Sequence, residues 1–139
     1  MYKKWITMCI IILGLPLAAL PAFAHHAFSA EFDATKPVRL EGKINRMEWI
    51  NPHSWLHVDV SNDDGSVDTW MVEAGPAGVL VRRGWRKDSI VSGTDVIVEG
   101  YQARDGSIRA NGRDVTLPNG ERLFAGSTGP GAPPEAGEQ

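Results

Sequence analysis

Residues 54–74 read SWLHVDVSNDDGSVDTWMVEA, and this stretch decides the fold. Apolar and polar residues alternate on both sides of the segment 63–66 (DDGS), whose composition is typical of a tight hairpin turn. The alternation places one set of apolar side chains on a common inner face: Leu56, Val58, Val60, Trp70 and Val72. Two antiparallel strands that share an apolar face predict a β-rich domain.

The preceding segment 38–49 (VRLEGKINRMEW) predicts a longer strand with an irregularity. Its apolar face begins with Val38, Leu40, Gly42 and Ile44. The phase then slips, so that Met47 and Trp49 carry the apolar face. A one-residue slip of this kind predicts a β-bulge near Asn45-Arg46.

The rest of the pattern supplies one helix and two more main strands. The segment 75–84 (GPAGVLVRRG) predicts a short helix, with Pro76 in its first turn and Gly84 after its end. Strands are expected over 95–101 and 107–117, followed by a short segment over 121–124. The order of three strands, a helix and two strands predicts an all-β fold of low helix content, an OB-fold-like five-stranded, partly open barrel. A plain β-sandwich is the alternative.

The N-terminus has the layout of a cleavable secretory signal over residues 1–24. Lys3 and Lys4 precede an apolar run over 5–20, and the segment 21–24 (PAFA) supplies small residues for cleavage before His25. An uncleaved membrane anchor is the alternative, but the run is shorter than the roughly 20 apolar residues that a bilayer crossing needs. We therefore expect a periplasmic protein with no membrane span after signal cleavage.

The remaining chain is expected to form one domain with two flanking segments. These are an N-terminal extension over 25–36, the barrel over 37–125, and a disordered Gly/Pro-rich tail over 126–139. Cys9 leaves with the signal, so the mature chain has no thiol and any metal site must use nitrogen and oxygen ligands. The full chain carries a formal charge of -3, and the mature chain is more acidic because Lys3 and Lys4 are lost. An acidic chain disfavours nucleic acid as a partner.

The loop between the first two strands is the predicted ligand-binding surface. Trp49 and Trp55 flank it, and Asn51 and His53 lie within it. In OB-folds this loop and the adjacent barrel face commonly bind ligands. The hypothesis is a non-enzymatic binding or interaction module for an unknown small molecule or periplasmic protein; no catalytic spacing indicates an enzyme. The alternative is that the tryptophans plug the ends of the barrel.

The histidines suggest a second function, binding of copper, zinc or another divalent metal. His25 and His26 would be the first two residues after cleavage, so His25 offers both an amine and an imidazole. His53 would supply a third nitrogen. The alternatives are that the first two histidines belong to a frayed terminus and that His53 faces solvent in its turn.

Several segments together resemble a family of small exported bacterial proteins of unknown function. They are 25–33 (HHAFSAEFD), 48–53 (EWINPH), 84–85 (GW), 93–100 (GTDVIVEG) and 105–107 (DGS). The resemblance covers nearly all of the mature chain, from His25 to Phe124, and implies export and similar domain limits, with no activity or cofactor. The strand order also resembles, more loosely, exported OB-fold proteins linked to stress tolerance, and a shared fold does not determine function.

Overall fold

The computed structural model describes residues 28–126. Its elements in chain order are α2 (Phe28–Glu31), β1 (Phe32–Glu48), β2 (Ser54–Ser61), β3 (Val67–Ala74), α3 (Ala77–Arg82), β4 (Asp95–Ala103), β5 (Arg109–Thr116) and β6 (Arg122–Phe124). The predicted signal over 1–24, the two histidines His25 and His26, and the tail from residue 127 onward lie outside the described residues.

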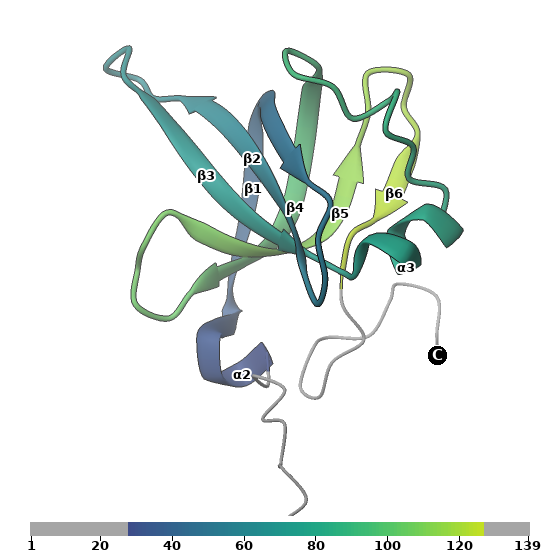
Figure 1. Cartoon of the computed structure of the whole chain (residues 1–139). Coiled ribbons are helices and arrows are strands. Elements are labelled where there is room, and N and C mark those ends of the chain that lie inside the picture. The colour runs from purple at the N-terminus through teal and green to yellow at the C-terminus, as the bar shows by residue number, and fades with distance from the viewer. Residues whose placement is uncertain (1–27, 127–139) are drawn as a thin grey trace, which may run out of the picture.

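The strands form one sheet that curls into a barrel (Figure 1). The order is β3-β2-β1-β4-β5-β6, and β3 also pairs with β5. That last pairing is parallel and short, from Met71–Arg109 to Glu73–Asn111, and it closes the ring. The predicted OB-fold-like barrel with a short helix between the third and fourth strands is confirmed, and β6 adds a sixth short strand beside β5.

The long strand β1 serves both halves of the barrel. It pairs with β4 along its earlier part and with β2 along its later part, and Lys43 pairs with both. The predicted bulge is confirmed by a register shift between Ile44 and Arg46. Just before it, a Cβ on Gly42 would lie only 2.2 Å from the backbone oxygen of Asp59. Glycine is therefore needed for β2 to approach β1 this closely.

The interior of the barrel is apolar and dense. Leu56, Val58 and Val72 are fully buried, as predicted, and Val60 and Trp70 pack against them at the edge of the core. At one end, the turn after α3 brings in Trp85, which is 1 % exposed. Its indole Nε1 donates a hydrogen bond to the carbonyl of Phe124 at 3.0 Å. The apolar surface of this side chain is thus buried, and its one polar atom has a hydrogen-bond partner.

The N-terminal segment docks on the barrel through a small separate core. Phe28 and Phe32 are buried together with Ala103, and the half-buried Tyr101 packs edge-on against Phe28 at 5.6 Å. Arg104 at the end of β4 donates a hydrogen bond to the carbonyl of Ser29 at 2.7 Å. Figure 1 shows α2 held at the foot of β1.

Candidate functional site

The first element of the site is a buried pair between the β1–β2 loop and β3. The loop contains a cis peptide bond between Asn51 and Pro52. His53 follows, and its Nδ1 lies 2.5 Å from Oε1 of Glu73. The Glu73 side chain is 7 % exposed, although it belongs to the outer face of β3. The loop is thus tied to the sheet by a carboxylate that is almost withdrawn from water.

The second element is an aromatic ring with a cation on it. Trp55 pairs with Glu73 across β2 and β3, so the two side chains lie side by side on the outer face. The guanidinium of Arg109, at the start of β5, lies 5.4 Å from the centroid of the Trp55 ring. Arg109 also pairs with Glu31 of α2 at 3.3 Å. We call these five residues the outer-face cluster: Glu31, His53, Trp55, Glu73 and Arg109.

The charges of the cluster interact. Burial raises the pKa of Glu73 above its ordinary value; His53 and Arg109 oppose this rise, while the charge of Glu31 adds to it. His53, Glu31 and Arg109 are each about one third exposed, at 32 %, 33 % and 34 % of their side chains. The cluster is therefore a half-open polar surface around one buried carboxyl group.

The structure divides the predicted binding residues into two groups. His53 and Trp55 both adjoin Glu73 in the outer-face cluster. Trp49 packs against the core instead, edge-on to Trp85 at 6.3 Å, so it lies with the interior as the alternative reading proposed. Asn51 is exposed in the loop.

Three residues of the cluster were missed as site residues. The neighbour relation of Trp55 and Glu73 follows from counting outward along both strands from the 63–66 turn, so this signal was present in the sequence. Arg109 joins them through the parallel β3–β5 pairing, and Glu31 through the docking of α2. Neither long-range contact has a local sequence signal.

The other histidine of β2 belongs to a different pair. His57 is buried, and its Nε2 lies 3.0 Å from Oε1 of Glu48 on β1. His53 and His57 thus contact different carboxylates. Within residues 28–126, no three His, Cys, Asp or Glu side chains are grouped so that they could hold a metal ion. The predicted copper or zinc site takes His25 and His26 from outside these residues.

An open hollow of about 710 Å³ lies elsewhere on the barrel, between β1, the β2–β3 tip and the end of β5. Its charged groups already have partners within the chain. Lys43 pairs with Asp95 at 2.6 Å. Asp59 accepts hydrogen bonds from Thr69 and Asn45, which lower the pKa of its carboxyl. No tryptophan lines this hollow, whereas Trp55 lies half-exposed in the outer-face cluster, so the cluster is the better candidate site.

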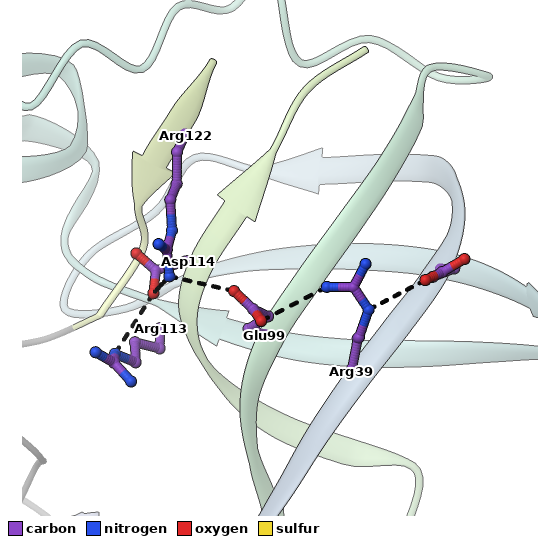
Figure 2. Close-up of polar contacts among 6 residues, drawn as sticks. Arg39, Glu99, Arg113, Asp114 and Arg122 are labelled. Atoms are coloured by element: carbon purple, nitrogen blue, oxygen red, sulfur yellow. Dashed lines mark hydrogen bonds and ion pairs between the residues drawn. The ribbon is translucent and has the colours of Figure 1, made fainter. Parts of the chain in front are cut away.

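A second charged surface runs across β1, β4, β5 and β6 (Figure 2). Arg39 of β1, Glu99 of β4 and Arg122 of β6 follow one another at 3.6 and 3.2 Å, and Arg122 continues to Asp114 of β5 at 2.8 Å. We call these four residues the ladder. Arg39, Glu99 and Arg122 are exposed or partly exposed, and Asp114 is buried, so the pairs link the solvated face of neighbouring strands to one covered carboxylate.

The fold and the cluster define a class: a small OB-fold-like barrel with a polar aromatic site on its β2–β3–β5 face. Within that class, the chain belongs to the family of unknown function DUF6152, whose family model matches residues 14–112. The expected resemblance to a family of unknown function is confirmed, and the match takes in every residue of the outer-face cluster. The curated proteins contain no match to this chain, and neither do the solved structures.

Proposed function

We propose that this protein is an exported, periplasmic binding module whose ligand site is the outer-face cluster. The observation that carries the proposal is the environment of Trp55: a half-buried indole beside the buried Glu73 and below the Arg109 guanidinium. The β1–β2 loop and the β4–β5 loop flank this face. OB-fold barrels commonly bind ligands on strands 2 and 3 between these two loops.

The energetics of Glu73 support a binding role. A carboxylate withdrawn from water destabilises the folded state unless its partners offset the loss of hydration. The raised pKa of Glu73 indicates that His53 and Arg109 do not fully offset it. Carboxyl groups with a pKa shifted by burial and by specific charged neighbours are often found at functional sites.

Export and a non-catalytic role complete the proposal. Residues 1–24 have the order of a secretory signal. Within residues 28–126, no helix is long and apolar enough to cross a membrane. The charged groups of the cluster are paired with one another, Glu73 with His53 and Glu31 with Arg109, which suits a site that holds a ligand by contacts.

The experiment is a thermal-shift screen of the protein beginning at His25, side by side with its Trp55→Ala variant. The compounds are oligosaccharides, amino acids, nucleosides and short peptides. A ligand at 100 times its dissociation constant stabilises the protein by about 2.7 kcal/mol, which is several degrees of Tm for a domain of this size. We expect at least one class to raise the Tm of the wild type and leave Trp55→Ala unchanged. Stabilisers that act equally on both proteins would contradict the proposal.

A second candidate function is binding of a divalent metal by His25 with His53. It is favoured by the docking of α2, because Glu31 contacts Arg109 and the described chain therefore begins beside the cluster that holds His53. Only three peptide units separate His25 from Phe28, a reach of about 11 Å at most. An amine and imidazoles are a ligand set that suits Cu(II) or Zn(II).

The metal hypothesis has its own test, titration of Cu(II) and Zn(II) into the protein beginning at authentic His25, followed by calorimetry and electron paramagnetic resonance. Stoichiometric binding at submicromolar affinity should disappear in His25→Ala and when one residue is added before His25. Weak binding that survives both changes rules this function out.

A further inference from the structure

We infer that the ligand of the outer-face cluster is a carbohydrate chain without charged groups, an oligosaccharide recognised through its hydroxyls and one sugar face. This inference rests on the proposed function and names the class of ligand for the same site.

The strand edges at the site are already used. Residues 71–73 of β3 pair with β2 on one side and with β5 on the other. A peptide that binds as an added strand needs a free edge, and none is available at this point of the sheet. The ligand is therefore recognised by side chains and not by backbone hydrogen bonds.

The charges at the site favour a neutral ligand. Two carboxylates, Glu31 and Glu73, accompany two basic side chains, His53 and Arg109. Arg109 already pairs with Glu31, so a phosphate or carboxylate would have to displace one carboxylate and approach another. Nucleic acid is further disfavoured by the net negative charge of the whole chain.

The hydrogen-bonding groups match a polyol. The carboxylates accept hydrogen bonds, and the guanidinium and imidazole N–H groups donate them. A sugar hydroxyl both donates and accepts, so neighbouring hydroxyls pair well with alternating acceptors and donors. The Arg109 guanidinium lies over the Trp55 ring, and the part of this half-buried indole that stays exposed adds an apolar surface against which the C–H groups of a sugar ring pack.

The surface extends past one ring. Met71 lies two residues before Glu73 on the same face of β3, and it is exposed. Its backbone N–H bonds to the carbonyl of Ile108, which is also exposed, so the two residues adjoin the cluster on the β5 side. Exposed apolar side chains beside a tryptophan offer further contacts for sugar rings, so we assign a chain of sugars and not a single one.

The experiment is an NMR titration of ¹⁵N-labelled protein beginning at His25. The neutral probes are cellohexaose, maltohexaose and the hexamer of N-acetylglucosamine; hexagalacturonate is the anionic probe of equal length. At least one neutral hexamer should shift the indole signal of Trp55 and the amides of residues 71–73. Its dissociation constant should change less than about twofold between 0.05 and 0.5 M salt, because an uncharged ligand releases no counterions.

Variants test which residues recognise the sugar. Trp55→Ala should raise the dissociation constant of the hexamer at least tenfold, and Trp55→Phe should raise it less. Glu31→Gln should raise it roughly threefold to tenfold. Trp70→Phe is the matched control, since Trp70 packs against the core from the inner face of β3, and the affinity of this variant should equal that of the wild type.

The outcomes separate this inference from the proposed function. If none of the three neutral hexamers shifts Trp55, the carbohydrate inference is overturned. If hexagalacturonate or a compound of another class then shifts Trp55, the binding face stands with a different ligand. If every probe leaves the signals of the cluster unmoved, both proposals fall.

Discussion

Trp85 and Trp55 are the same residue type in two opposite settings. Trp85 is buried at one end of the barrel, and the Phe124 carbonyl accepts its only donor. Trp55 lies half-buried on the outer face, where its neighbours are charged and half-exposed. The fold accounts for every group of Trp85. The partners of Trp55 also tie the β1–β2 loop and α2 to the barrel, but its indole stays half-exposed beside them, and this difference is the main reason to place the site there.

The two charged surfaces differ in the same way. The ladder of Figure 2 joins side chains that include the exposed Arg39 and Arg122, so water competes for the Arg39–Glu99 and Glu99–Arg122 pairs. Each surface also holds one nearly buried carboxylate, Asp114 in the ladder and Glu73 in the outer-face cluster, and burial raises the pKa of Glu73. Exposed pairs contribute little to stability and cost little. A buried carboxylate costs more, which makes its presence informative.

The largest expected effect tests the comparison of Trp85 with Trp55 by replacing each with alanine. Trp85→Ala should lower the free energy of unfolding by about 3–5 kcal/mol, because it leaves a cavity and an unpaired carbonyl. Trp55→Ala should lower it by about 1 kcal/mol, since the ring is only half-buried. Urea denaturation of the two variants measures both, and equal losses would contradict the distinction.

The next effect concerns the support of the cluster by α2. Phe28→Ala should lower the free energy of unfolding by about 2–3 kcal/mol, because Phe28 anchors the small core with Phe32 and Ala103. It should also loosen the Glu31–Arg109 pair. Hydrogen exchange at Arg104 is the direct readout, since its amide bonds to the carbonyl of Glu31. Unchanged protection there would show that α2 is held by other contacts.

A smaller effect, of opposite sign, is expected at Glu73. Burial raises its pKa above the ordinary 4.5, so the folded state favours the neutral carboxyl. Its contribution to stability is fully present below about pH 4.5 and is lost as the pH rises through the folded pKa. Glu73→Gln should therefore stabilise the protein by about 1 kcal/mol at pH 8 and by nearly nothing at pH 4. Unfolding curves at the two pH values check this; a variant less stable at pH 8 would show that the His53 pair outweighs the burial.

The smallest effect belongs to the ladder. Arg39→Ala should change the free energy of unfolding by no more than about 0.5 kcal/mol, and 0.5 M salt should erase the difference. Thermal denaturation at low and high salt measures it. A salt-resistant loss above 1 kcal/mol would show that the ladder supports the barrel.

Much of the fold could be predicted from the sequence because its signals are local. Alternation located the inner faces of the strands, the phase slip after Ile44 located the bulge, and the segment 63–66 located the hairpin. Alternation predicted five strands and only a short further segment over 121–124, where the structure has a sixth strand, β6. Each of these depends on residues a few positions apart, where backbone geometry links sequence directly to structure.

The site was only half predictable because its residues meet across long distances in the chain. His53 and Trp55 follow from the loop position that OB-folds use. Glu31 and Arg109 are 78 positions apart, and their contact exists only because α2 docks and β3 pairs with β5. Trp49 was predicted from its place beside the loop, and its ring packs edge-on to Trp85; its role in binding stays a prediction.

The most direct test of the central claim, that the outer-face cluster exists for binding and not for the fold, is the stability of the double variant Trp55→Ala/Glu73→Gln in urea at pH 7. The small loss at Trp55 and the gain at Glu73 oppose each other, and with the coupling of these two cross-strand neighbours the free energy of unfolding should lie within about 2 kcal/mol of the wild type. A loss of about 3 kcal/mol or more would contradict the account, because it would make the cluster part of the structural support of the barrel.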